Sequence, residues 1–200
     1  MTRTRKRVAV LALQGAFAEH VASLRALGAE AFPVRLPADL DDVDGLVIPG
    51  GESTTIRRLM LSYGLAGKLR ELHQQGMPIL GTCAGMILLA RRVLDSTEST
   101  IGAIDITVTR NAFGRQLESF QTLLTIPILG EAPFPAVFIR APLVAEAGPG
   151  VETLATLPDT STVAAKQGSI LVTAFHPELT SDLRLHAHFL SMIDQEGRAR

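Results

Sequence analysis

The stretch MPILGTCAGMILLA (77–90) decides how this sequence is interpreted, because it contains the only cysteine of the chain, Cys83. PILGT (78–82) is typical of a short buried strand, and AGMILLARRVL (84–94) of a helix. Glycines stand two positions before and two positions after the cysteine. A sharp strand-to-helix turn needs such small neighbours, since it holds the central residue in an unfavourable backbone conformation. The stretch therefore predicts a nucleophile elbow.

A lone cysteine is more often a small buried hydrophobic residue than a nucleophile. Here the flanking glycines and the strand–helix context favour the nucleophile. A thiol at the start of a helix lies at its positive end, which favours the thiolate. The backbone amide of Ala84, the first residue of that helix, is then free to stabilise an oxyanion.

The rest of the first half of the chain alternates between strand and helix patterns. Strand-like runs cover 8–13, 29–36, 45–51 and 78–82, and helical patterns cover 17–27, about 53–62, about 64–75 and 84–94. This alternation predicts an α/β fold of three layers, with a mainly parallel central sheet between two layers of helices. Pro33 within the second strand places that strand at an edge of the sheet.

The second half has a different pattern. The runs AIDITVT, TLLTIPI, AVFIR, STVAAKQ and SILVTAF between about 101 and 175 are separated by turn residues. They predict an antiparallel extension of the sheet or a second small sheet. An amphipathic helix over about 181–195 closes the chain. We expect one domain over 1–200, with flexible ends at 1–7 and about 196–200.

Composition excludes several classes of function. A formal charge of −1 provides no field that attracts nucleic acid. No apolar run reaches the 18 or so residues of a membrane span, and the run after the basic start is too short for a signal peptide. One cysteine cannot form an internal disulfide, so a cytoplasmic location is expected.

A nucleophilic thiol needs a base, and the base needs an orienting group. His176 follows the apolar strand SILVTAF directly, whereas the other four histidines fall in helical patterns: His20, His73, His186 and His188. Residues i and i+2 of an extended segment project to the same side, so Glu178 is expected beside His176. A strand-end histidine next to a surface glutamate fits the spacing equally well. The nucleophile predicted at Cys83 favours the interpretation of His176 and Glu178 as members of a triad.

PGGEST (49–54) ends the strand before the cysteine-bearing one. The backbone amide at Gly51 is unobstructed and is a candidate second oxyanion donor. Glu52 and Ser53 are candidates for contact with a polar substrate. Ser53 or Thr54 is also expected to cap the following helix. A phosphate-binding loop is excluded, because no lysine follows the glycines.

Taken together, the motifs resemble a known family. GTCAG, PGGEST and FHPEL, in this order, are similar to the class I (triad) glutamine amidotransferases. LALQGAFAEH, GGESTT and RNAFGRQ, with FIRAP and VAAKQG, resemble the glutaminase subunits of pyridoxal 5′-phosphate synthase, the PdxT/SNO family. The resemblance runs from residue 8 to about 190 and implies a flavodoxin-like amidotransferase fold.

The resemblance also implies roles for individual residues. Cys83 would be the nucleophile, with His176 and Glu178 completing the triad, and the amides of Gly51 and Ala84 would form the oxyanion hole. The implied glutamine site comprises Gly51, Glu52, Ser53, Arg110, Ile139 and Arg140. A guanidinium suits the α-carboxylate of glutamine. Neither a metal nor an organic cofactor is expected.

The implied partner is the synthase subunit, a barrel enzyme that joins ammonia with ribose 5-phosphate (or its ketose isomer) and glyceraldehyde 3-phosphate. In the family, docking in a large assembly of both subunits activates the glutaminase. We expect the peptide at the glycine pair to reorient on docking, because glycine permits this at little cost. Gln14 and the segment after it are candidates for the docking surface.

Three alternatives stay open from the sequence. The chain could be the glutaminase subunit of another synthase, such as the one in histidine biosynthesis, which should lack RNAFGRQ and LALQGAFAEH. It could be a different Cys–His hydrolase, although there the histidine commonly follows soon after the cysteine. It could also be a non-catalytic regulatory subunit, against which the intact Cys83, His176 and Glu178 argue.

Overall fold

The computed structural model of the chain describes residues 5–94, 96–112 and 119–199. Its α-helices are α1 (Phe17–Ala26), α2 (Ser53–Ser62), α3 (Leu65–Gln74), α4 (Ala84–Leu89) and α5 (Arg184–Ala199). Its strands are β1 (Arg7–Leu11), β2 (Glu30–Val34), β3 (Gly45–Ile48), β4 (Ile79–Thr82), β5 (Ala90–Val93), β6 (Ile104–Thr109), β7 (Ser119–Leu124), β8 (Phe134–Ile139), β9 (Leu143–Ala147), β10 (Glu152–Thr156), β11 (Thr162–Gln167) and β12 (Ile170–Thr173). Short 3-10 helices are η1 (Pro37–Leu40), η2 (Pro127–Leu129) and η3 (Pro177–Leu179).

One large sheet forms the centre of the molecule, in the order β2-β1-β3-β4-β12-β11-β9-β6-β5, with β10 paired to β11. The first five strands in this order are parallel to one another. Strands β3, β4 and β12 are buried at every position, which explains why they consist of continuous apolar runs rather than alternating ones. The predicted α/β class and the flavodoxin-like order of the first strands are confirmed, and Pro33 lies on the edge strand β2 as expected.

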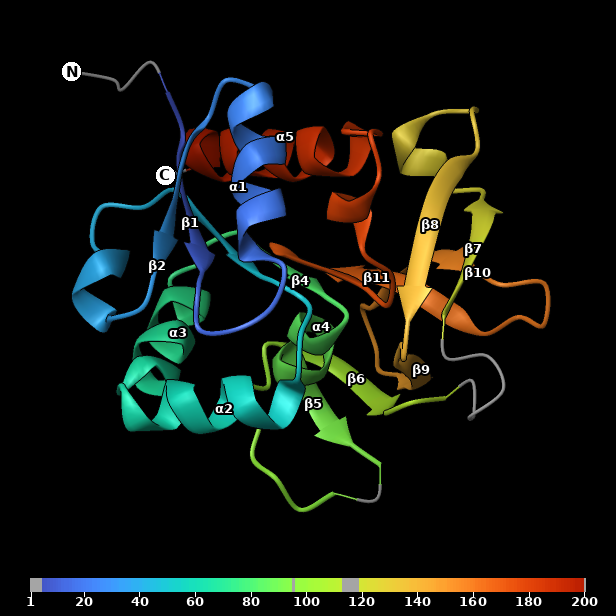
Figure 1. Cartoon of the computed structure of the whole chain (residues 1–200), viewed down its shortest axis with the longest axis horizontal. Coiled ribbons are helices and arrows are strands. Elements are labelled where there is room, and N and C mark those ends of the chain that lie inside the picture. The colour runs from blue at the N-terminus through green and yellow to red at the C-terminus, as the bar shows by residue number, and fades with distance from the viewer. Residues whose placement is uncertain (1–4, 95, 113–118, 200) are drawn as a thin grey trace.

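Helices cover both faces of the sheet (Figure 1). Helices α1 and α5 lie on one face, and α2, α3 and α4 lie on the other. Each contributes fully buried side chains to the core, such as Leu24 from α1, Leu69 from α3 and Phe189 from α5. The three predicted layers are therefore present.

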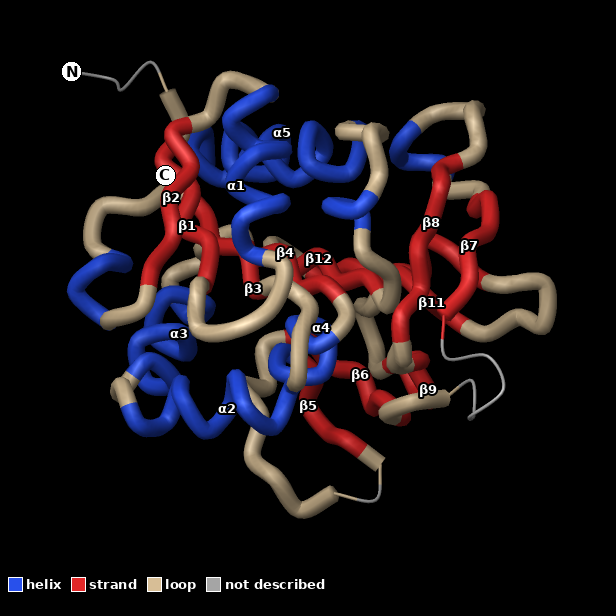
Figure 2. Tube along the Cα trace, viewed as in Figure 1, coloured by secondary structure: helices blue, strands red, loops and turns tan. Residues whose placement is uncertain are grey.

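Both forms predicted for the second half occur together (Figure 2). Strands β11, β9 and β6 extend the sheet by antiparallel pairing, and β7 and β8 form a separate two-stranded sheet. Strands β9 and β10 were not expected, because their largely exposed residues give no apolar signal. The strand expected over 122–128 instead covers Ser119–Leu124, since Pro127 begins η2.

The helix expected over 84–94 is the main local error. Helix α4 ends at Leu89, and Ala90–Val93 pairs with β6 as β5. The exposed Arg91 and Arg92 between two buried residues do not alternate as in an ordinary strand, so tertiary pairing with β6, rather than the local pattern, selects the strand. Arg7 starts β1 and α5 continues to Ala199, whereas 1–4 and 200 lie outside the described residues. The flexibility expected at both ends of the chain stays a prediction.

The carboxyl ends of the parallel strands meet at one edge, where ligands bind in folds of this kind. Strands β4 and β12 pair in register from Ile79 opposite Ile170 to Thr82 opposite Thr173. Beyond that register the Cys83 N–H donates to the Thr173 carbonyl at 2.8 Å. The sheet thus brings the cysteine beside the segment that leads to His176. In the described ranges, no helix is both long and apolar enough for a membrane span.

Candidate active site

Cys83 occupies a strained elbow between β4 and α4. Its φ of 49° and ψ of −102° are rare for a residue with a side chain. The flanking glycines are required by close contacts: a Cβ on Gly81 would lie 2.8 Å from the carbonyl carbon of Gly85, and one on Gly85 would run into the carbonyl group of Ile48. The structure therefore has the elbow that the glycine spacing predicts.

His176 lies beside the elbow, just after β12. The backbone N–H of His176 donates to the Val137 carbonyl of β8 at 2.8 Å, which fixes the backbone at this position. Its Nδ1 donates to Oε1 of Glu178 at 2.7 Å, and both side chains are buried. The expected contact is present, but the 3-10 turn η3 brings the two side chains together rather than a continuing extended segment. With Nδ1 engaged, Nε2 is the nitrogen left for chemistry.

The electrostatics of this pair favour the charged form of both groups. Burial lowers the pKa of His176, but its interactions with the Cys83 thiol and the Glu178 carboxylate outweigh burial and raise the pKa to about 10. Burial raises the pKa of Glu178, but His20 and His176 together bring it well below its usual value. An imidazolium held by a carboxylate is therefore the resting state at neutral pH, ready to donate a proton.

A cavity of about 500 Å³ opens over the thiol. It collects every residue expected to bind substrate: Gly51, Glu52, Ser53, Arg110, Ile139 and Arg140. The Cys83 thiol lies 3.8 Å from the carbonyl oxygen of Ile139. Ala84 begins α4 directly after the nucleophile. The rest of the RNAFGRQ motif beyond residue 112 lies outside the described residues.

Glu52 has a structural task that the sequence did not reveal. We expected Ser53 or Thr54 to cap the helix, but the N-cap is Glu52, whose carboxylate accepts the N–H groups of Thr54 at 3.1 Å and Thr55 at 2.7 Å. The hydrogen bond from the Thr55 hydroxyl and these backbone bonds lower the pKa of Glu52. The carboxylate is therefore committed to the start of α2, and Glu52 borders the cavity in that conformation.

Three further residues line the cavity that were not among the expected binding residues: Gln14, Ile87 and Asn111. The Gln14 side chain accepts the Glu52 N–H at 2.6 Å and so fastens the loop that carries Gly51. Ile87 lies one helical turn after Cys83, a spacing that could have identified it. Asn111 adopts a φ of 48°, a conformation that asparagine tolerates.

A second group of unexpected residues lies behind the triad. His20 and His186 fall in helical patterns and are not expected at the site, yet both are fully buried. His20 contacts Glu178 and Thr82, and His186 contacts His20. Nothing local in the sequence indicates this cluster, since His20 and His186 are 166 positions apart. In the described part of the chain, no group of three or more metal-binding side chains is assembled.

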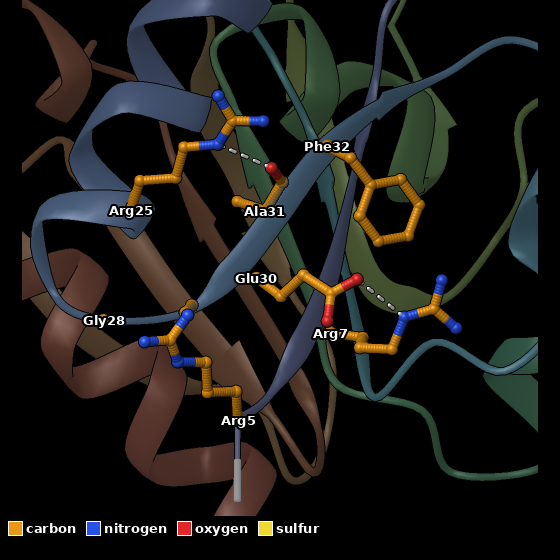
Figure 3. A pocket seen from close by; sticks show the side chains of 8 residues that line it. Arg5, Arg7, Arg25, Gly28, Glu30, Ala31 and Phe32 are labelled. Carbon is orange, nitrogen blue, oxygen red and sulfur yellow. Dashed lines mark hydrogen bonds and ion pairs between the residues drawn. The ribbon is translucent and has the colours of Figure 1, made fainter. Parts of the chain in front are cut away.

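A second hollow of about 510 Å³ lies at the opposite edge of the sheet, near the starts of β1 and β2 (Figure 3). Three arginine side chains surround it, but two are already engaged. Arg7 pairs with Glu30 at 3.2 Å, and Arg25 donates to the carbonyl of Ala31 at 2.9 Å. Because the end of α1 directs its carbonyls here, the site does not favour an added anion. The chemistry therefore belongs to the cavity over Cys83.

Comparison with known proteins gives a consistent result. The sequence profile of the SNO glutamine amidotransferase family matches residues 10–195. A protein of Pelotomaculum thermopropionicum named pyridoxal 5′-phosphate synthase subunit PdxT is 56% identical over 192 residues, covering 96% of this chain and 97% of that protein. The protein of the same name from Moorella thermoacetica is 53% identical and covers 94% of this chain and 99% of its own length.

Solved structures agree with the sequence relatives. One described as a glutamine amidotransferase superposes with a TM-score of 0.88 at 44% identity, covering 94% of this chain and 98% of that chain. The PurLQS structure from Thermotoga maritima superposes with a TM-score of 0.71 at 15% identity, covering 94% of this chain and 99% of that one, which shows a shared fold.

Proposed function

This chain belongs to the SNO glutamine amidotransferase family, and on that premise we propose that it hydrolyses L-glutamine to L-glutamate and ammonia for pyridoxal 5′-phosphate synthesis. The observation that carries the proposal is the meeting, in one cavity, of a strained cysteine with a histidine held by a buried carboxylate. We further propose that residues 1–200 act as one amidotransferase domain in the cytoplasm.

The proposed reaction begins with the Cys83 thiolate attacking the side-chain carbonyl carbon of glutamine. A carbon–sulfur bond forms, and the carbonyl oxygen becomes an oxyanion that the amides of Gly51 and Ala84 stabilise. The imidazolium of His176 gives its proton to the leaving nitrogen, the carbon–nitrogen bond breaks, and ammonia departs. A γ-glutamyl thioester remains on the enzyme.

The second half restores the enzyme. His176, now neutral, takes a proton from water while the water oxygen attacks the thioester carbon. The carbon–sulfur bond breaks, glutamate leaves, and the thiolate and imidazolium are regenerated. Glu178 stays ionised throughout and stabilises the imidazolium, as its low pKa requires.

Substrate selection is assigned to the cationic side of the cavity. Arg110, which follows β6, and Arg140, which follows β8, border the cavity and suit the α-carboxylate of glutamine. Nη1 of Arg110 also lies 3.7 Å from Oε2 of Glu98, so this carboxylate partly balances the positive charge of Arg110 in the absence of substrate. We assign a hydroxyl contact with the substrate to Ser53, which begins α2 and lines the cavity.

Ammonia released to water is lost, so a glutaminase of this size requires an acceptor. The relatives are named as subunits of pyridoxal 5′-phosphate synthase, and we propose that this chain docks with the synthase subunit in a large hetero-oligomer and channels ammonia to it. The carboxyl edge of the sheet, where Gln14 fastens the loop of Gly51, is the surface at which docking can act on the oxyanion hole.

The test is glutamate release from L-glutamine by the purified chain, alone and with the synthase subunit, with Cys83→Ala as the control. We expect activation by the partner that the mutation abolishes. Activity that ignores this partner would assign the chain to another amidotransferase pathway. Absence of activity under both conditions would refute the glutaminase and favour a regulatory subunit.

A further inference from the structure

The second oxygen of Glu178 faces away from His176 into an enclosed polar cluster. Nε2 of His20 lies 3.2 Å from Oε2 of Glu178, and both side chains are fully buried. In the described part of the chain, Oε2 makes no hydrogen bond of ordinary geometry. The His20 ring is therefore the main compensation for negative charge on this oxygen, and a buried carboxylate requires such compensation.

The same nitrogen also contacts the residue before the nucleophile. Nε2 of His20 lies 3.2 Å from Oγ1 of Thr82, and this hydroxyl oxygen accepts the N–H of Gly50 at 3.0 Å. One ring thus contacts the carboxylate that orients His176 and the hydroxyl that anchors the loop leading to Gly51. These contacts join α1, β4 and η3 behind the cavity.

His186 determines which nitrogen of His20 carries the proton. Its Nε2 lies 2.9 Å from Nδ1 of His20, and its own Nδ1 is buried without a hydrogen bond among the described residues. Burial, followed by the influence of His20, lowers the pKa of His186 to about 3, so His186 is neutral at neutral pH. An orphaned buried N–H is rarer than an orphaned acceptor, so the proton of His186 lies on Nε2 and is donated to His20.

With Nδ1 of His20 accepting that bond, the proton of His20 lies on Nε2, facing Thr82 and Glu178. The opposite tautomer would direct a lone pair at an ionised carboxylate. The electrostatics of Glu178 and the unpaired nitrogen of His186 thus lead independently to the same tautomer. Helices α1 and α5, which lie together over this part of the sheet, supply the two rings (Figure 1).

We infer that His20 is a positioning residue of the triad: its Nε2–H, oriented by His186, holds the Glu178 carboxylate where Oε1 accepts the His176 N–H. The inference rests on the proposed glutaminase activity. It gives the histidine of the LALQGAFAEH segment a task that composition and periodicity did not reveal. His20 does not line the substrate cavity, so its effect is on turnover rather than on glutamine binding.

The decisive comparison is His20→Gln against His20→Asn in the complex with the synthase subunit. The amide nitrogen of glutamine reaches the position of Nε2, whereas that of asparagine reaches only the position of Nδ1. We expect His20→Gln to keep kcat within about 5-fold of wild type, and His20→Asn and His20→Leu to lower it about 10- to 100-fold, the range for groups that orient a reacting residue. KM for glutamine should change by less than about 3-fold in all of them.

His73→Leu is the matched control, because His73 is a half-buried helix histidine on α3, on the other face of the sheet. It should keep wild-type kcat. Equal losses in the glutamine and asparagine variants, or a loss expressed in KM, would overturn the inference. A wild type without glutaminase activity would refute the proposed function instead, so the two failures are distinguishable.

A measurement on the wild-type chain covers the case in which a substituted chain fails to fold. Nitrogen-15 NMR of labelled histidines reports which ring nitrogen is protonated, and the predicted spectrum has a proton on Nε2 of His20. A bare Nε2 at neutral pH would overturn the inference without any mutation.

Discussion

Substituting Gly50 by alanine places a methyl group between the loop and the triad. An added Cβ would lie 2.9 Å from Nδ1 of His176 and 3.2 Å from Cβ of Cys83, and closer still to Cε1 of the imidazole. Gly50 is not among the residues with positive φ, so alanine can adopt the backbone conformation. The substitution therefore perturbs the contact with the ring rather than the loop itself.

The size of the perturbation follows from these distances. An ordinary Cβ contact begins at 3.4 Å, so Nδ1 at 2.9 Å must retreat by about 0.5 Å, and Cε1 must retreat further. The ring as a whole then moves by roughly 1 Å. A displacement of that size between reacting groups costs on the order of 100-fold in rate.

The assay is steady-state glutamate release in the presence of the synthase subunit, together with thermal unfolding of each variant. Gly50→Ala should lower kcat by about 100-fold and change KM by less than about 3-fold. Gly67→Ala is the control, because nothing lies within 4 Å of its added Cβ on α3. It should keep full activity and gain up to about 1 kcal/mol of stability. A Gly50→Ala enzyme within about 5-fold of wild-type kcat would refute the packing of His176 on this loop.

Three other predictions address the elbow, the oxyanion loop and the buried histidine. Gly85→Ala should lower the free energy of unfolding by roughly 2 kcal/mol, because its Cβ meets the Ile48 carbonyl group; an unchanged melting temperature would contradict the tight elbow. Gly51→Val should lower kcat far more than it raises KM, because the added Cβ meets the Gln14 side chain that fastens the loop; equal effects on both would count against a mobile oxyanion peptide. His186, which faces His20 and Glu178, has a pKa of about 3 in the fold against an ordinary 6.5. Below pH 6.5 His186 is therefore protonated in the unfolded chain but stays neutral in the folded chain, so the free energy of unfolding decreases. His186→Gln should reduce the loss of unfolding free energy between pH 7 and pH 5 by about 2 kcal/mol, measured by denaturant titration; identical pH slopes would show that the fold accepts this proton.

The sequence was most informative where the determining interactions are local. The glycines around Cys83 predicted the elbow because the sharp turn is itself a local feature, although the carbonyl group that excludes a side chain at Gly85 is that of Ile48 on β3. The apolar runs of β3, β4 and β12 predicted a doubly covered sheet because burial on both faces removes polar positions. His176 was found through its place after β12, and its contact with Glu178 depended only on their closeness in the chain.

Long-range interactions explain the features that the sequence did not reveal. The switch from helix to strand at Ala90 depends on pairing with β6, and the Glu52 cap competes with neighbours that are better capping residues by type. The contact between His20 and His186 joins two helices at opposite ends of the chain. No local pattern distinguishes such histidines from surface ones.

In the proposed reaction, Cys83 releases ammonia from glutamine for use by the synthase subunit. The most direct test is pyridoxal 5′-phosphate formation by the reconstituted complex carrying Cys83→Ala, supplied in parallel with L-glutamine or with an ammonium salt. We expect synthesis from glutamine to disappear while synthesis from ammonium continues at the wild-type rate. Continued synthesis from glutamine would contradict the proposed reaction, because another group would then be releasing the ammonia.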